Sequence, residues 1–157
     1  MSTAEAGKAG RIISINISRK KGQVKTPVPE ADIVAGEGII GDAHRAFAHR
    51  QVSLLMVELI EEQAARIGDR GSIAIGPGAF AENLTTEGLE LRGCRVGDEL
   101  VVGAGGVRLR ITQIGKECHS RCAIYKLAGD CIMPELGVFC EVLEGGTVRV
   151  GDAIEKR

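Results

Sequence analysis

Short runs in which apolar and polar residues alternate, separated by glycines, recur through most of this 157-residue chain. Ile13, Ile15 and Ile17 alternate with polar residues, and the same period of two returns from Val107 to Ile111. Such alternation is typical of half-buried β-strands. Glycine supplies 22 residues, roughly double the ~7% of an average protein, and an excess of glycine serves turns between short strands. The pattern predicts a mostly β fold.

Apolar residues repeat at helical spacing in one long segment, from Val57 to Ile67, with charged residues between them. This predicts one main α-helix over about residues 57–67, ended by Gly68 as a left-handed cap. Many short strands, glycine turns, short helical turns and one helix together favour a strongly bent, closed or partly closed β-barrel. We expect a flexible N-terminus over residues 1–9 and a single barrel domain over residues 10–157.

Glycine-rich turns indicate where strands connect. Gly103–Gly106 is predicted to close a hairpin, and Gly145-Gly146 is predicted to join strands at 138–143 and 147–150 as a second one. The sequence Arg95-Val96-Gly97-Asp98 recurs as Arg149-Val150-Gly151-Asp152. The recurrence is too short for a repeat architecture, so we interpret it as one turn used twice, each time leading into a strand.

Charge and hydropathy exclude several classes of partner. The net charge is −1 and the pI is near 6.3, so no overall field would draw the protein onto nucleic acid or anionic lipid. The apolar stretches, such as Val52 to Val57, are far shorter than the ~20 residues that span a bilayer. Met1 to Gly10 does not resemble a secretory signal. We therefore expect a cytoplasmic protein that binds neither nucleic acid nor membrane.

The densest reactive cluster surrounds Cys118, one of five cysteines. An odd cysteine count in a reducing compartment favours thiols or ligands over disulfides. Lys116, His119 and Arg121 would each favour the thiolate form of Cys118, which is the nucleophilic and metal-binding form. Cys118 is therefore the predicted reactive thiol, against the alternative of a small apolar residue in a turn. The strand-like surroundings of Cys94 and Cys140 indicate core residues instead.

A structural zinc site is the alternative use of this cluster, with the ligands Cys118, His119, Cys122 and Cys131. Zinc ligands usually come in pairs two to four residues apart, whereas Cys131 follows Cys122 after a gap of eight residues. The spacing makes zinc an unfavoured cofactor.

Three further segments carry polar side chains suited to a binding site. His44, after the turn Gly41-Asp42, titrates near neutral pH and is predicted to donate a proton or contact a cofactor. The planar fork of Arg50 suits a phosphate or oxo group. In the segment Glu82 to Thr86, Asn83 would read the edge of a heterocycle or, alternatively, satisfy turn backbone.

These segments, in this order, resemble the MOSC domain, named for the C-terminal domain of molybdenum cofactor sulfurases, in its stand-alone bacterial-type branch. The matching pieces are Lys25 to Val28, Gly38 to His44, Arg50 to Leu55, Pro77 to Thr86, the Cys118 loop, and Val142 to Ile154. The resemblance implies a bent barrel whose pocket handles sulfur or the molybdenum cofactor. Cys118 matches the family cysteine, which carries persulfide sulfur or ligates molybdenum.

The resemblance and the motifs together predict catalytic roles for Cys118 and His44, with Cys118 also as a metal ligand. The predicted cofactor-binding residues are Lys25, Asp42, His44, Arg50, Glu82, Asn83, His119 and Arg121. The implied cofactor is a transiently bound molybdenum cofactor. The implied partners are molybdenum-cofactor biosynthesis proteins or a pyridoxal-phosphate-dependent cysteine desulfurase, with a redox partner if the protein is an enzyme. A non-catalytic cofactor carrier or chaperone and a zinc-stabilised interaction module remain as alternatives.

Overall fold

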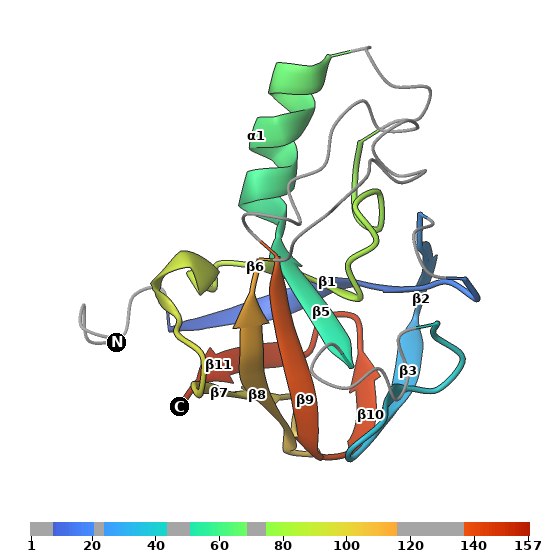
Figure 1. The fold of residues 1–157 in the computed structure, drawn as a ribbon, viewed down its shortest axis with the longest axis vertical. Coiled ribbons are helices and arrows are strands. Elements are labelled where there is room, and N and C mark those ends of the chain that lie inside the picture. Colours follow the sequence, from blue (N-terminus) through green and yellow to red (C-terminus); the bar gives the residue numbers. More distant parts are fainter. Residues whose placement is uncertain (1–7, 21–23, 44–50, 69–74, 116–136) are drawn as a thin grey trace.

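The computed structural model describes residues 8–20, 24–43, 51–68, 75–115 and 137–157, and β-strands are the commonest element among them (Figure 1). Seven strands form a closed barrel in the order β11-β7-β8-β9-β5-β6-β1, and pairing of β1 with β11 closes it. Their bounds are β1 (Ala9–Ile17), β5 (Val52–Met56), β6 (Leu84–Glu87), β7 (Glu99–Val102), β8 (Val107–Ile114), β9 (Val138–Glu144) and β11 (Ala153–Lys156). The prediction of a mostly β barrel is confirmed.

A smaller three-stranded sheet stands beside the barrel, formed by β10 (Gly146–Arg149), β3 (Glu30–Val34) and β4 (Gly38–Ile39). The predicted hairpin between residues 138–143 and 147–150 is wrong, because β10 pairs with β3 instead of β9. Both edges of β9 are already taken by β5 and β8. The chain leaves the barrel at Gly145 and passes close to the Ile33 backbone. A residue with a Cβ would not fit there, because that Cβ would lie 2.4 Å from the Ile33 carbonyl oxygen.

The first strand is not the regular alternation that its sequence suggests. Its register shifts between Ile12 and Ser14, as at a β-bulge, so Ile12 and Ile15 lie in the core. Ile13 is only half-buried. Ser14 and Asn16, on the opposite face, are buried as well. At its end β1 also pairs with the short strand β2 (Thr26–Val28), which has the extended geometry that a proline favours in the residue before it.

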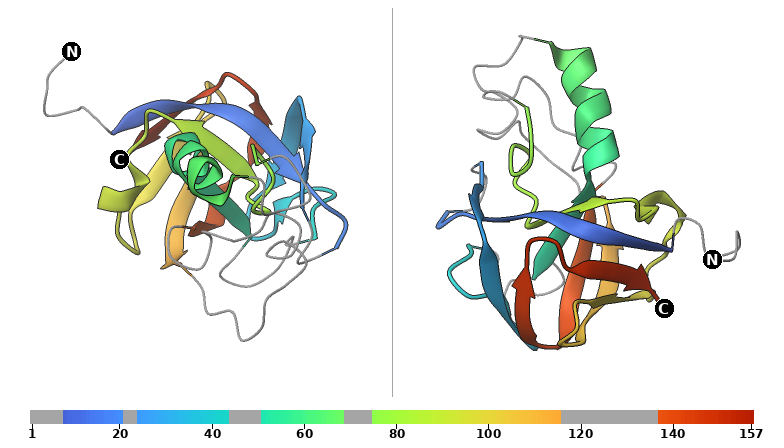
Figure 2. Two further views of the ribbon diagram at one scale, coloured as in Figure 1. Left: turned by 90° about the horizontal axis from the view of Figure 1, so that it is seen from above. Right: turned by 180° about the vertical axis from the view of Figure 1, so that it is seen from behind.

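The single helix of the described chain, α1 (Val57–Ile67), has the predicted bounds and projects beyond one end of the barrel (Figures 1 and 2). The Gly68 N–H donates to the Ala64 carbonyl, and its φ of 60° is positive, but its ψ of −122° lies outside the left-handed helical region that we predicted. A 3-10 turn, η2 (Leu91–Gly93), follows β6. Among the described residues, no helix is long and apolar enough to cross a membrane.

The repeated four-residue sequence builds the same turn twice. Gly97 and Gly151 have φ values of 98° and 96°, which suit glycine at the third position of a type II turn. In each turn the Asp side chain accepts the backbone N–H of the Arg three residues earlier, at 2.8 Å. The turns lead into β7 and β11, which pair with each other. The predicted reuse of one turn is therefore confirmed, as is the hairpin at Gly103–Gly106.

Candidate functional site

Six polar side chains are buried together on β1, β5, β6 and the segment that enters β6, and we call them the polar layer. Their residues expose at most 7% of their surface. They are Ser14, Asn16, Ser53, Glu82, Asn83 and Thr85. Because buried polar groups are costly unless they are hydrogen-bonded, the contacts within this layer decide what each residue does.

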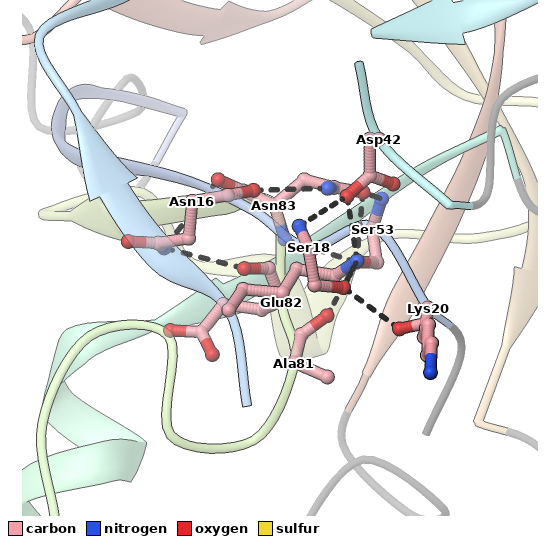
Figure 3. Close-up of polar contacts among 9 residues, drawn as sticks. Asn16, Ser18, Lys20, Asp42, Ser53, Ala81, Glu82 and Asn83 are labelled. Atoms are coloured by element: carbon pink, nitrogen blue, oxygen red, sulfur yellow. Dashed lines mark hydrogen bonds and ion pairs between the residues drawn. The ribbon is translucent and has the colours of Figure 1, made fainter. Parts of the chain in front are cut away.

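Asn83 joins three parts of the barrel (Figure 3). Its amide nitrogen donates to the Asn16 carbonyl at 3.1 Å, and its amide oxygen accepts the backbone N–H of Ser53 at 3.0 Å. The Asn83 N–H in turn donates to the Ser53 carbonyl at 3.0 Å. This geometry favours the second of the two roles considered for Asn83, that of satisfying backbone groups. A role in reading a heterocycle remains a prediction.

Asn16 and Thr85 form a chain of hydrogen bonds that ends on Glu82. The Ser14 hydroxyl donates to the Asn16 amide oxygen at 2.7 Å, and the Asn16 amide nitrogen donates to the Thr85 hydroxyl oxygen at 3.1 Å. The Thr85 hydroxyl donates to Glu82 Oε2 at 2.7 Å. Burial raises the pKa of the Glu82 carboxyl above its ordinary value, although the hydrogen bonds to it act in the opposite direction.

Lys25 and Asp42 form a buried ion pair beside this layer. The Lys25 Nζ lies 2.7 Å from Asp42 Oδ1, and both side chains are 0% exposed. Ser18 ties the pair to the end of β1, since its N–H donates to Asp42 Oδ1 at 3.1 Å and its hydroxyl oxygen accepts from Lys25 Nζ at 3.2 Å. Two distant predicted residues are thus brought into direct contact.

The segment before β6 passes close to the Lys25 backbone, and one glycine makes this possible. The Lys25 N–H donates to the Gly78 carbonyl at 3.0 Å. A Cβ on Gly78, whose φ is 87°, would lie only 2.4 Å from the Lys25 carbonyl oxygen. Ala81, with a φ of 64°, is the one non-glycine residue of the described chain in the left-handed region. The segment is therefore held in a conformation that tertiary contacts must maintain.

Of the predicted site residues, Lys25, Asp42, Glu82 and Asn83 lie among these contacts. The other predicted residues lie outside the described residues; they are His44, Arg50, Cys118, His119 and Arg121, together with the zinc candidates Cys122 and Cys131. The assignment of His44, Arg50, Cys118 and Asn83 to catalysis or cofactor binding implies that they line one pocket, and this stays a prediction. No group of three or more His, Cys, Asp or Glu side chains among the described residues could hold a metal ion.

Cys94 and Cys140 are buried in the hydrophobic core, as predicted. Burial raises the pKa of both thiols, which opposes formation of a thiolate. Within the described part of the chain, the cysteines are therefore packing residues.

Sequence reasoning missed Ser14, Asn16 and Ser53 as members of the polar layer. The alternation in β1 predicted polar residues facing solvent, whereas Ser14 and Asn16 are buried and Asn16 donates to the Glu82 carbonyl in the segment before β6. The one usable signal was the number of hydrogen-bonding side chains in Glu82 to Thr86, which need buried partners.

A sequence model of the MOSC domain matches residues 41–155. The fold is similar to that of the YuaD protein from Bacillus subtilis, with a TM-score of 0.75 and 21% identity over 94% of this chain and 95% of that one. YiiM from Geobacillus stearothermophilus has a TM-score of 0.69 and 21% identity over 94% of this chain and 75% of that one. YiiM from Escherichia coli has a TM-score of 0.69 and 17% identity over 94% of this chain and 69% of that one. No functionally curated protein matches. At these identities the structural similarity shows the fold alone.

Proposed function

The chain belongs to the MOSC domain family, and from this premise we propose that it binds molybdenum cofactor or carries sulfane sulfur on Cys118. The family is generally linked to molybdenum-cofactor and sulfur chemistry. A soft thiolate suits both molybdenum and sulfane sulfur. With Cys94 and Cys140 buried in the core, Cys118 is the thiol that this proposal uses.

The observation that carries the proposal is the position of the two residues that flank segment 116–136. The Gly115 N–H donates to the Gly137 carbonyl at 2.7 Å, so the two residues on either side of the segment lie together at one point of the barrel. Leu54 on β5 pairs with Val138 on one side and with Leu84, which follows Asn83, on the other. Three peptide units extend at most about 11 Å, which limits how far Cys118 can be from Gly115. This supports a site shared by Cys118 and the polar layer.

The described residues are suited to hold the segments around a molybdenum-cofactor site in place, rather than to act as ligands of the cofactor. The Lys25 ammonium is buried and paired with Asp42, and Asn83 is bonded to backbone groups, so these side chains hold the surrounding segments in place. When bound, the cofactor would supply the oxo-transfer and sulfur-ligand chemistry of molybdenum. Its soft ligand would be Cys118, and we assign proton donation to His44 and contacts with anionic groups to Arg50, His119 and Arg121.

Sulfur loading on Cys118 needs no oxidant. The Cys118 thiolate attacks the terminal sulfur of a persulfide on a cysteine desulfurase, the S–S bond of that persulfide breaks, and the desulfurase cysteine leaves as a thiolate. Cys118 then carries the transferred sulfur as its own persulfide. A pyridoxal-phosphate-dependent desulfurase or a cofactor-biosynthesis protein is accordingly the proposed partner. We also propose a cytoplasmic location, because a sulfur-carrying thiol needs a reducing compartment.

The test compares Cys118→Ser with the matched variants Cys122→Ser and Cys131→Ser. Each is incubated with a cysteine desulfurase and cysteine, and persulfide loading is measured as a mass increase of one sulfur atom. Molybdenum content and ultraviolet-visible spectra are recorded for protein made in a host that synthesises molybdenum cofactor. Selective loss of loading or molybdenum in Cys118→Ser, with an unchanged melting temperature, is the expected result.

Loading and molybdenum content that survive in Cys118→Ser would contradict the proposal. Sulfur loading without turnover in the wild type would identify a carrier rather than an enzyme. Stoichiometric zinc, with unfolding on chelation and comparable damage from losing any one ligand, would instead identify a zinc-stabilised interaction module.

A further inference from the structure

Glu82 is a fully buried acid that the segment 75–83 wraps around. Its Oε2 accepts the Gly78 N–H at 2.9 Å and the Thr85 hydroxyl at 2.7 Å. Its Oε1 is buried and has no hydrogen-bond partner among the described residues. One carboxyl oxygen thus accepts two hydrogen bonds and the other accepts none, although the backbone N–H groups of Phe80 and Glu82 also act to lower the pKa of the carboxyl.

This arrangement suits a neutral acid better than a carboxylate. A neutral carboxylic acid has one carbonyl oxygen that accepts two hydrogen bonds, as Oε2 does here, and its hydroxyl on Oε1 is then a buried but uncharged group without a partner. A carboxylate would bury a negative charge with one oxygen unpaired, and such a charge is far more costly to bury than a neutral polar group. Burial accordingly acts to raise the pKa of Glu82.

The charged groups among the described residues around the segment do not offset this cost. Besides Glu82, the polar layer contains only hydroxyl and amide side chains. On the side of β2, Lys25 is paired with Asp42. On α1, Glu58 accepts the Gly88 N–H at 2.9 Å and brings a negative charge. The described surroundings therefore contain no cation that contacts the Glu82 carboxyl.

We infer that Glu82 is a neutral acid in the closed protein and that segment 75–83 stays closed over the polar layer while Glu82 keeps its proton. Two hydrogen bonds to Oε2 tie Gly78 and Thr85 to this side chain in the closed form. Once Glu82 ionises, the buried carboxylate gains free energy by reaching water, and the segment must move to let it do so. The positive φ of Ala81 adds strain that opening relieves. The inference stands apart from sulfur chemistry, because it concerns access to the polar layer only.

The direction of the pH effect follows from proton linkage. The closed form holds its proton to a higher pH than the open form, in which Glu82 returns to its ordinary pKa of 4.5. Opening is therefore rarest below pH 4.5 and becomes more frequent as pH rises, by about tenfold per pH unit, until the closed form also ionises. In a Glu82→Gln variant, whose side-chain amide cannot ionise, opening would show no such dependence on pH.

The experiment measures amide hydrogen exchange at Gly78, Ala81 and Asn83 between pH 5 and 8, corrected for intrinsic base catalysis. Wild type is compared with Glu82→Gln, which cannot ionise, and with Glu61→Gln, which removes an exposed helix carboxyl. We expect the opening of segment 75–83 to rise with pH in wild type and in Glu61→Gln, by up to about tenfold per unit for as long as the closed form keeps its proton. In Glu82→Gln it should stay constant.

A second measurement needs no variant and remains decisive if Glu82→Gln does not fold. Carbon-13 NMR of wild type labelled at the glutamate carboxyls should show one protonated acid at pH 6, and its ionisation at higher pH should accompany the opening. Absence of a protonated glutamate at pH 6 would overturn the inference. An equal pH dependence of exchange in wild type and Glu82→Gln, or ionisation without opening, would also overturn it.

Discussion

Neutralising one member of the Lys25–Asp42 ion pair should destabilise the fold far more than neutralising both. Both side chains are 0% exposed and their charged atoms are 2.7 Å apart. Lys25→Met leaves a buried carboxylate that still accepts the Ser18 N–H, and Asp42→Asn leaves a buried ammonium. Removing one partner of a buried pair typically lowers the free energy of unfolding by about 3–5 kcal/mol, because the remaining buried charge has lost its ion-pair partner. We expect a loss of that size in each single variant.

The double variant tests whether the loss comes from the stranded charge. With Lys25→Met and Asp42→Asn combined, no charge is buried, and an amide oxygen at position 42 still accepts the Ser18 N–H. Replacing both partners of a buried pair is often close to neutral. We expect the double variant to lose about 1–2 kcal/mol, less than either single variant, so that the two changes are strongly non-additive.

The assay is urea denaturation at pH 7 followed by circular dichroism, since the chain has no tryptophan and one tyrosine. The control is the exposed pair Arg11–Glu87, whose side chains are 62% and 47% exposed. There, single and double neutralisation should each change the unfolding free energy by about 1 kcal/mol or less. Additive losses at Lys25 and Asp42, or single losses as small as those of the control, would refute the reasoning.

Two further predictions use the same protein preparations. Gly78→Ala should lower the unfolding free energy by about 3 kcal/mol, because its Cβ would lie 2.4 Å from the Lys25 carbonyl oxygen. Gly36→Ala is the control, at a φ of 72° in open space, and should lower the unfolding free energy by about 1 kcal/mol. Equal losses of the two variants in urea denaturation would contradict this prediction. Iodoacetamide at pH 8 should leave Cys94 and Cys140 unmodified in the native protein, because burial raises the pKa of both thiols. Mass spectrometry that finds either thiol labelled as fast as in urea would show that its burial is wrong.

Local patterns predicted the elements that local interactions decide. The helical period fixed α1 at Val57–Ile67, and the alternation in β8 matches the burial of Val107, Leu109 and Ile111. Strand partners are decided elsewhere in the chain. The glycine pair before β10 predicted a hairpin, but β10 pairs with β3, more than a hundred residues away in sequence. The sequence around one strand does not indicate which strand edges are already paired with other strands.

The candidate site was also predicted only where local sequence is informative. Lys25, Asp42, Glu82 and Asn83 were predicted from their motifs, and their residue types were informative because polar groups of these kinds are rarely buried without partners. That Asn16 belongs with them was not predictable, since a polar residue in an alternating strand ordinarily faces water. Its burial depends on a segment more than sixty residues later in the chain, which contributes the Glu82 carbonyl that it contacts.

The parallel pairing of β5 with β6 ties the site to correct folding of the barrel. It is the one parallel pairing among the described strands, and parallel neighbours require a long return crossover, here through α1 and segment 75–83. Leu54 faces the core opposite Leu84, while their neighbours Ser53 and Asn83 bond to each other. A slip of one residue would exchange inward and outward side chains along β6 and separate that pair. Molecules with the shifted register would therefore lack the polar layer. The site can form only when the crossover has brought β6 beside β5 in the native register.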